Sequence, residues 1–448
     1  MNMNNRYLFF VCIVVAMGGL LFGFDTAVIS GTIPFIRKYF NLNDIELGWA
    51  VGSLLIGCMF GVAISGKPAD HLGRRKTLLI SAFLFLFSTF GSALSTTIIS
   101  FISFRFVGGI AVGTASLLSP MYISEISPAE KRGSMVSLNQ LAIVTGILVA
   151  FFSNYFLVGT GENNWRLMLC ALGIPSIVFF VSLLFVPESP RWLLQKGKRE
   201  EALNILGRIV GSERASAEIL TIEESLVTET KASLKEVFSK KMRPILGIGI
   251  FVAVFQQITG INSIMYYAPM IFAKTGIGIG KAYMQTVAVG AGNLIFTFLA
   301  MKLIDRVGRK PLLIAGNIGM LLSLLSLSIT FFMEKTGGYL VLASVLVYIA
   351  SFSLSVGPVT WVLISEIYPN RLRSEAMSVV VVILWAACFL VSLTFPYMLN
   401  VLGGGSPFLI FGTMCAIYLI FIILKVPETK NKSLEELEKI LFKNNILN

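Results

Sequence analysis

Asp25 is the first residue whose type and position could do chemistry. It is the only ionisable residue in GGLLFGFDTAVISG (residues 18–31), inside the first long apolar run of the chain. A carboxylate at that depth costs about 2.5 kcal/mol or more on insertion scales, so it needs a partner or a water-filled path. The surrounding glycines allow other helices to come close. Two interpretations follow: a proton or cation site in a transport path, or a structural ion pair between helices.

Arg105, in SFRFVGGIAVG, is the other deeply placed charge. At 1.5 Å per residue, Asp25 lies about 14 Å from the outer end of its span, and Arg105 lies about 10 Å below the same side. Their similar depth predicts that the two can pair. The guanidinium stays charged, so only the carboxylate of this pair titrates. Pairing and unpairing would therefore switch the affinity of the carboxylate for a proton.

A third group of polar residues lies in QQITGIN, where Gln256, Gln257 and Asn262 interrupt another apolar run. Amide side chains offer donors and acceptors without a charge, which suits the hydroxyl groups of a sugar. On an ideal helix Gln256 and Asn262 are about 120° apart. Gly260 between them allows a kink or unwound turn, as in the discontinuous helices of transporters.

Other apolar runs add further candidate ligands for a sugar: Gln140, Asn293, Trp361 and Trp385. Tryptophan can stack on the apolar face of a pyranose and offers one N–H donor. An amide such as Asn293 is equally compatible with a structural hydrogen bond between helices, so both interpretations stay open for it.

The composition identifies the class of protein that positions these groups. Of 448 residues, 55% are hydrophobic and only 13% are charged, which excludes an ordinary soluble domain. Apolar stretches long enough to cross a bilayer recur. We expect twelve spans, at 7–33, 46–67, 76–95, 98–123, 134–158, 166–186, 244–273, 281–305, 311–333, 338–367, 374–400 and 406–426. All five cysteines fall in these spans, which indicates packing residues and neither disulfides nor a metal site.

The net charge of +12 is distributed as in a membrane protein with both ends in the cytoplasm. With the N-terminus inside, the short inner loops hold most of the lysines and arginines, which is the positive-inside pattern. This distribution explains the basic charge without a nucleic-acid partner.

An internal repeat divides the chain. DHLGRRK, SEISPAEKRG and PESPRW return in the same order as DRVGRKP, SEIYPNRLRS and PETKNK, at spacings of 235 to 241 residues. Such a duplication predicts two six-helix halves with a substrate site between them. We expect halves at 1–187 and 244–427, a helical cytoplasmic linker at 188–243, and a cytoplasmic C-terminal helix at 428–448. That last helix would begin with a capping box at Ser433–Glu436.

The chain resembles the sugar porter family of the major facilitator superfamily. The resemblance is carried by GFDTAVISG, DHLGRRK, PMYISEISPAEKRG, PESPRWLL, QQITGINSIMYYAP, DRVGRK and PETKNKSLEELE, from about Gly18 to Glu438. It implies an all-α membrane protein with twelve transmembrane helices in two six-helix halves, the major facilitator fold, and short cytoplasmic helices between the halves.

The resemblance also implies roles for individual residues. Gln140, Gln256, Gln257 and Asn262 match sugar ligands of the family, Phe22 and Trp385 match lining aromatics, and Tyr266 and Tyr267 match gating tyrosines. Asp25 matches the proton-coupling residue of the bacterial symporters. Leu384 stands where relatives carry an amide, which leaves glucose, galactose and xylose open as substrates.

Charged residues at the predicted inner ends of the helices form a further set. They are Asp70, Arg74, Arg75, Glu125, Arg132, Asp305, Arg309, Glu366 and Arg373. The family implies that such ion pairs close the cytoplasmic side of the outward-facing state. The alternative is ordinary anchoring of the helices at the membrane surface.

These observations predict a secondary transporter of the plasma membrane that imports a monosaccharide with a proton by alternating access. The alternatives are a facilitative uniporter, in which Asp25 and Arg105 form a fixed pair, a sugar sensor without transport, and an exporter of the same superfamily. We expect no enzyme activity, no cofactor and no metal, because no nucleophile constellation or ligand spacing is present. The expected partners are the sugar, the proton and the lipid bilayer, for a monomeric protein.

Overall fold

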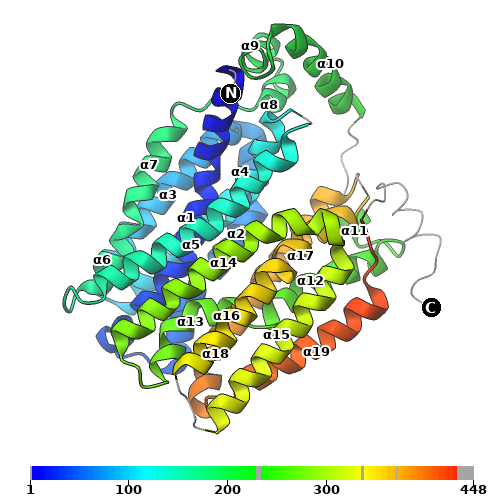
Figure 1. Ribbon diagram of the computed structural model, residues 1–448. Coiled ribbons are helices and arrows are strands. Elements are labelled where there is room, and N and C mark those ends of the chain that lie inside the picture. Colours follow the sequence, from blue (N-terminus) through cyan, green and yellow to red (C-terminus); the bar gives the residue numbers. More distant parts are fainter. Residues whose placement is uncertain (1–2, 129, 229–233, 334–337, 370, 431–448) are drawn as a thin grey trace. The chain divides into compact units, whose positions relative to one another are not determined.

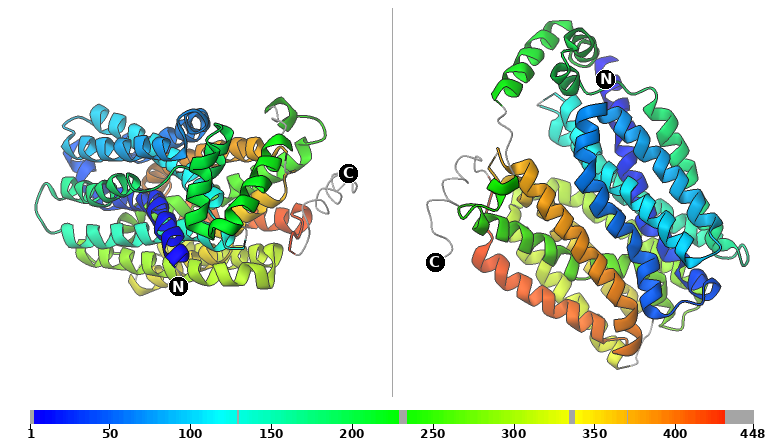
Figure 2. Two further views of the ribbon diagram at one scale, coloured as in Figure 1. Left: turned by 90° about the horizontal axis from the view of Figure 1, so that it is seen from above. Right: turned by 180° about the vertical axis from the view of Figure 1, so that it is seen from behind.

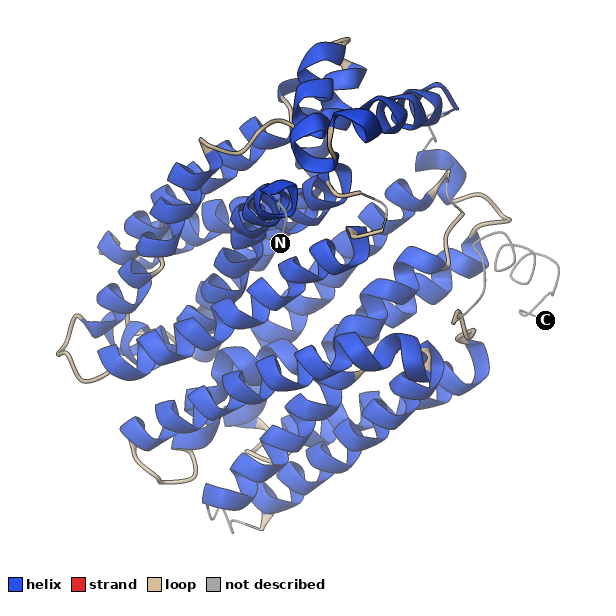
Figure 3. Ribbon diagram, turned by 45° about the horizontal axis from the view of Figure 1, so that its top comes forward, coloured by secondary structure: helices blue, strands red, loops and turns tan. Residues whose placement is uncertain are grey.

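The computed structural model describes residues 3–128, 130–228, 234–333, 338–369 and 371–430. Within these ranges the chain is helical and contains no strand (Figures 1 and 3). The same ranges hold 12 helices that are long and apolar enough to cross a membrane. Helices satisfy every backbone hydrogen bond internally, as a lipid environment requires. The twelve predicted spans are confirmed, although the first continues past its predicted end to Tyr39.

The first six spans are formed by α1 (Met3–Tyr39), α2 (Asp44–Leu72), α3 (Arg74–Leu94), α4 (Ile98–Ile126), α5 (Arg132–Leu157), and the pair α6 (Asn164–Ala171) and α7 (Gly173–Leu183). The last six are formed by the pair α12 (Arg243–Ile258) and α13 (Ile261–Ala273), then α14 (Ile279–Val307), α15 (Arg309–Phe332), the pair α16 (Gly338–Leu354) and α17 (Val356–Glu366), α18 (Arg373–Val401) and α19 (Ser406–Lys425).

The segment between these two sets is helical, as predicted. It contains α8 (Pro190–Gln195), α9 (Arg199–Val210), α10 (Ser212–Thr228) and α11 (Leu234–Val237). Helices α9 and α10 lie side by side and share a small apolar core (Figure 1), made of Leu206, Ala215 and Ile219. The predicted C-terminal helix with its capping box at Ser433–Glu436 lies outside the described residues.

The chain divides into two compact units. The first comprises Met1–Val28, Ile56–Ala150 and Arg166–Lys231, and the second comprises Ile29–Leu55, Phe151–Trp165 and Ala232–Asn448. Within the first unit α3 packs along α4 and α7, and within the second α15 packs along α16 and α19 (Figures 1 and 2).

The predicted halves differ from these units because residues 29–55 group with the later part of the chain. Gly48 on α2 shows the physical reason. A Cβ atom at this position would lie 2.3 Å from the Leu393 carbonyl oxygen of α18, so only a glycine permits such close packing. The boundaries at 187 and 244 stay a prediction.

Glycine has a similar role beside Asp25 in the first unit. A Cβ atom on Gly23 would lie 1.9 Å from the carbonyl oxygen of Ile143, so α1 and α5 touch through their backbones. This contact confirms that the glycines around Asp25 allow a neighbouring helix to approach closely.

Gly260 separates α12 from α13. Its φ of 96° lies in the left-handed region, where other residues are strained. A Cβ atom here would also lie 2.2 Å from the ring of Phe411. The predicted break in this span is therefore confirmed. Two further breaks, not predicted, separate α6 from α7 at Leu172 and α16 from α17 at Ser355.

Candidate functional site

Asp25 and Arg105 form a buried ion pair in the first unit. Arg105 Nη1 on α4 donates a hydrogen bond to Asp25 Oδ1 on α1. The exposed fractions of the two side chains are 3% for Asp25 and 2% for Arg105. The pairing predicted from their depth is therefore present in the structure.

The pair leaves part of the guanidinium unsatisfied. Within the described residues, Arg105 Nε and Nη2 are buried and have no hydrogen-bond partner. Removing one member of a buried pair leaves an uncompensated charge, which is strongly unfavourable. Neutralising the carboxylate is therefore expected to change the local environment of Arg105 substantially.

The amides of QQITGIN form a hydrogen-bonded chain in the second unit. Gln257 Nε2 donates to Gln256 Oε1 at 3.2 Å, and Asn262 Nδ2 donates to Gln257 Oε1 at 2.6 Å. The break at Gly260 permits this contact, because an unbroken helix would turn Asn262 away from the two glutamines. We call these three side chains the amide relay.

The amide relay is anchored to the break between α16 and α17. Gln256 Nε2 donates to the backbone carbonyl oxygens of Val356, at 3.3 Å, and Gly357, at 3.1 Å, in the first turn of α17. Gln256 and Gln257 are 3% and 6% exposed, whereas Asn262 is half-buried. The three amides thus connect the breaks in two membrane helices.

The other predicted sugar ligands have varied surroundings. Tyr267 donates to the Ser392 carbonyl oxygen at 3.0 Å, and its neighbour Tyr266 is also buried. Trp385 is buried on α18, whereas Trp361 on α17 is 37% exposed. Buried tyrosines between helices are consistent with gating and with packing alike.

Asn293 makes the interhelical contact that was the alternative to a role in sugar binding. Its Oδ1 atom accepts a hydrogen bond from Ser353 Oγ at 2.7 Å, which links α14 to α16. Gln140 and Phe22 are half-buried in the first unit, on α5 and α1. They therefore belong to a different unit from the amide relay.

The charged cluster of the first unit is centred on Arg74. The Arg74 guanidinium donates to Glu125 at 3.1 to 3.2 Å and to Asp70 Oδ1 at 3.1 Å. Glu125 also accepts a hydrogen bond from Ser189 Oγ. The side chains of Arg74 and Glu125 are 3% and 7% exposed, so this is a buried pair. Arg132, which was also expected to pair here, is exposed.

Arg75 and Glu188 join the loop after α7 to the start of α3. Arg75 Nε donates to the Leu183 carbonyl oxygen at 3.1 Å, and Glu188 Oε1 accepts from the Arg75 backbone N–H at 3.0 Å. Burial raises the pKa of the Glu188 carboxyl above its ordinary value, and the backbone hydrogen bonds only partly offset this.

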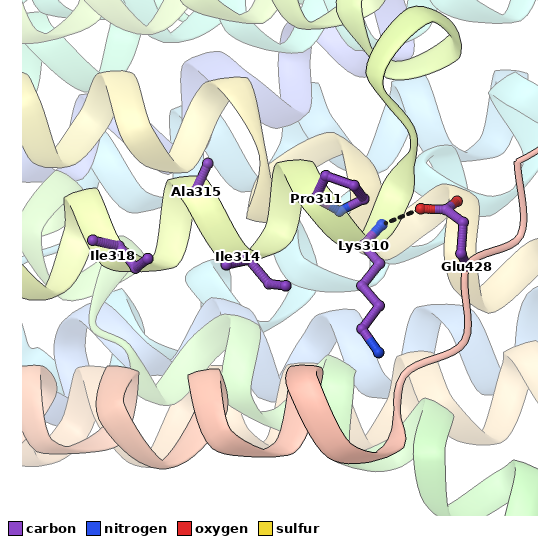
Figure 4. Close-up of a pocket in the computed structure, with 6 residues that line it drawn as sticks. All are labelled: Lys310, Pro311, Ile314, Ala315, Ile318 and Glu428. Atoms are coloured by element: carbon purple, nitrogen blue, oxygen red, sulfur yellow. Dashed lines mark hydrogen bonds between the residues drawn. The ribbon is translucent and has the colours of Figure 1, made fainter.

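The second unit repeats this cluster. Arg309 Nη2 donates to Glu366 Oε1 at 2.9 Å, and Thr429 Oγ1 donates to Glu366 Oε2 at 2.5 Å. Glu428 accepts from the backbone N–H group of Arg309 at 3.1 Å. It also accepts from the backbone N–H group of Lys310 at 3.0 Å (Figure 4). Each residue occupies the position of its counterpart in the first unit, so the duplication seen in the sequence extends to the individual contacts.

Two further residues predicted for these clusters have other surroundings. Arg373 is half-buried at the start of α18 and interacts electrostatically with Glu366. The Asp305 side chain lies outside the part of the chain whose side chains the structure describes.

Four members of the clusters were not predicted from the sequence: Ser189, Thr429, Glu188 and Glu428. The repeated motifs PES and PET contain all four. This repetition is the signal that could have identified them, since a duplicated carboxylate before a Ser or Thr indicates a duplicated contact.

The two capping glutamates are expected to respond oppositely to neutralisation. Burial raises the pKa of Glu428, but the N–H groups of Lys430, Arg309 and Lys310 outweigh it and hold that pKa below its ordinary value. Its charge therefore stabilises the folded state above the unfolded pKa, and this contribution is lost as the pH falls through the folded pKa. The pKa of Glu188 is raised, so the ionised form of its carboxyl disfavours the folded state instead of stabilising it. We expect Glu428→Gln to lower the Tm at pH 7 more than Glu188→Gln; the reverse order would contradict this assignment.

A cluster on the predicted outer side links early and late helices within the second unit. Asp44 Oδ1 accepts from Arg37 Nη2 and from Asn400 Nδ2, both at 2.8 Å. Tyr283 donates to the Gly31 carbonyl oxygen. Lys274 Nζ donates to the Leu399 carbonyl oxygen at 3.4 Å, beside this cluster. We call Arg37, Asp44 and Asn400 the outer cluster.

Comparison with known proteins adds to this geometry. The family model described as sugar (and other) transporter matches residues 11–441. The chain is 41% identical to the arabinose-proton symporter of Bacillus subtilis over 443 residues, covering 98% of this chain and 96% of the relative. It is 40% identical to the D-xylose-proton symporter of Escherichia coli K12 over 475 residues, with coverage of 98% and 96%.

Solved structures of the Escherichia coli xylose transporter XylE are also similar. An inward open conformation matches with a TM-score of 0.87 at 39% identity, covering 97% of this chain and 99% of that one. XylE bound to 6-bromo-6-deoxy-D-glucose matches with a TM-score of 0.80 at the same identity, covering 97% and 99%.

Proposed function

We propose, since the chain belongs to the sugar transporter family and is a multi-pass membrane protein with the major facilitator fold, that it imports a monosaccharide together with a proton. The observation that carries the proton part is the buried pair of Asp25 and Arg105. Two of the similar proteins are named proton symporters for arabinose and xylose, both aldopentoses. The amide relay supplies uncharged donors and acceptors suited to such a substrate.

The protein is proposed to work in the plasma membrane of its cell, as a monomer with both termini in the cytoplasm. The basic residues at the helix ends around Gly73 and Gly308 support this orientation; they are Arg74, Arg75, Lys76, Arg306, Arg309 and Lys310. The sugar would then bind from the outside, where the proton gradient of an energised membrane also supplies protons.

In the proposed mechanism Asp25 carries the proton. The ionised carboxylate holds Arg105 in the ion pair. Protonation from the outside removes the charge that binds Arg105, and the loaded carrier changes conformation and releases sugar and proton inside. One proton that moves down 100 mV contributes about 2.3 kcal/mol. This energy supports an accumulation ratio of about fifty.

Uptake by proteoliposomes with and without an imposed proton gradient tests the proposal. We expect gradient-driven accumulation of at least one of arabinose, xylose, glucose and galactose. Sugar added outside should also acidify the vesicle lumen or move positive charge into it. If none of these aldoses enters the vesicles under either condition, the proposal of sugar transport is wrong.

A facilitative uniporter is the second candidate function. The observation that favours it is the burial of both members of the Asp25 and Arg105 pair, which is compatible with a fixed structural contact. A uniporter equilibrates the sugar at the same final level with and without the gradient, so the same uptake experiment distinguishes the two functions.

The outer cluster is proposed to hold the external side closed, so weakening it is expected to favour the outward-facing state. Asn400→Ala removes the hydrogen bond between α18 and Asp44 and keeps the Arg37 and Asp44 pair. For an exposed hydrogen bond to a charged group, we expect an increase of about threefold to fivefold in the apparent affinity for external sugar.

Thr394→Ala is a matched control for Asn400→Ala. Thr394 lies on the same helix, and its hydroxyl donates only to the Leu390 and Val391 carbonyl oxygens of that helix. An equal change in both variants would show that the outer cluster does not bias the conformation.

A further inference from the structure

Cys388 on α18 contacts the end of the amide relay. Asn262 Nδ2 donates to the Cys388 thiol, with 3.1 Å between nitrogen and sulfur. The Tyr266 side chain also hydrogen-bonds this thiol. Cys388 is 1% exposed, and no motif in the sequence assigns it a role. It therefore lies between two residues predicted to face the sugar.

The direction of every hydrogen bond in the amide relay follows from its anchor. The backbone carbonyls of Val356 and Gly357 only accept, so the NH₂ group of Gln256 must face them. Its oxygen is then left to accept from the NH₂ group of Gln257. The Gln257 oxygen accepts in turn from Asn262.

At the end of the amide relay both hydrogens of the Asn262 amide are occupied. One is donated to Gln257 Oε1 and the other to the Cys388 sulfur. The remaining polar atom of this half-buried side chain is Oδ1, which accepts no hydrogen bond from the described residues. Asn262 therefore presents an acceptor and no free donor.

We propose that Cys388 is a positioning residue for the sugar: it occupies the second N–H of Asn262, so that Asn262 can only accept a hydrogen bond from a sugar hydroxyl. This inference rests on the proposed function. A hydroxyl can donate and accept, but the site uses only its donor capacity here. The selection therefore acts against substrates that lack a hydroxyl hydrogen at this position.

Deoxy and deoxyfluoro sugars separate the two capacities of a hydroxyl. A deoxy position can neither donate nor accept, whereas a fluorine atom can accept weakly but cannot donate. At the hydroxyl that meets Asn262, the wild-type protein should lose affinity equally for both analogues. Cys388→Ala frees one N–H of Asn262, so the fluoro analogue should bind about threefold better than the deoxy analogue.

The experiment is competition against uptake of the aldose that the protein transports best in the vesicle panel. The competitors are the monodeoxy and monodeoxyfluoro analogues of that aldose, one pair for each ring hydroxyl. The quantity compared is the inhibition constant of the deoxy analogue divided by that of the fluoro analogue, called the deoxy-to-fluoro ratio. Cys388→Ser retains an acceptor for Asn262, so its deoxy-to-fluoro ratio should match that of the wild type. Cys415→Ala is the matched control, since Cys415 is also buried in the second unit and its thiol makes no hydrogen bond to the amide relay within the described residues.

Each outcome decides the inference. A ratio that rises in Cys388→Ala and not in Cys388→Ser or Cys415→Ala supports it. If the ratio stays the same in Cys388→Ala, or if Cys388→Ser behaves like Cys388→Ala, the thiol does not set the donor pattern, although sugar transport stands. If no aldose is transported, the proposed function fails first, and this inference fails with it.

Discussion

Asp25→Asn is expected to abolish accumulation of sugar against a gradient while preserving sugar exchange. An asparagine has nearly the same shape as an aspartate, and its oxygen can still accept the hydrogen bond from Arg105 Nη1. It cannot bind or release a proton, so the proton gradient loses its connection to the conformational change. We expect the accumulation ratio at 100 mV to fall from as much as about fifty to about one.

The measurement for this variant combines uptake and counterflow in the same proteoliposomes. Counterflow exchanges labelled for unlabelled sugar and needs no net proton movement, so it reports folding and binding. Glu213→Gln is a matched control, because it makes the same acid-to-amide change on the exposed face of α10. An Asp25→Asn variant that still concentrates sugar would show that this residue is not the coupling site.

Arg105 offers an independent test of the same pair. Arg105→Met removes the guanidinium and leaves the Asp25 carboxylate buried without its partner. An uncompensated buried carboxylate takes up a proton more readily. The uniporter hypothesis predicts that the proton gradient has no effect on sugar accumulation in Asp25→Asn, in Arg105→Met or in the wild type.

The features that could be predicted from the sequence are those that depend on position along a helix. The twelve spans follow from continuous apolar runs, because a lipid-spanning segment has a fixed minimum length. The Asp25 and Arg105 pair follows from counting residues from the ends of two such spans. The Gly260 break follows from a glycine beside buried amides.

The features that could not be predicted depend on contacts between distant segments. The direction of the amide relay is set by the carbonyls of Val356 and Gly357, about 100 residues beyond Gln256. The hydrogen bond between Asp44 and Asn400 joins residues 356 positions apart. Hydropathy and motif spacing contain no information on which helices meet at these points, so neither contact was predicted.

Glu125→Ala is expected to be the most destabilising change in the charged clusters around Arg74 and Arg309. It leaves Arg74, whose side chain is 3% exposed, without its main carboxylate partner. Breaking a buried pair by removing one member typically costs about 3 to 5 kcal/mol. We expect a clear fall in the Tm of the purified protein and slower net transport, because the variant should populate the inward-facing state more.

The duplicated cluster supplies the control for this prediction. Glu366→Ala makes the same change beside Arg309, but the side chains of Arg309 and Glu366 are 12% and 23% exposed. Water can therefore solvate the unpaired arginine, and the fall in Tm should be smaller than for Glu125→Ala. The double variant Arg74→Met with Glu125→Leu removes both buried charges and should recover most of the stability. If transport also recovers in this double variant, the Arg74 and Glu125 pair stabilises the fold but does not control the cytoplasmic side.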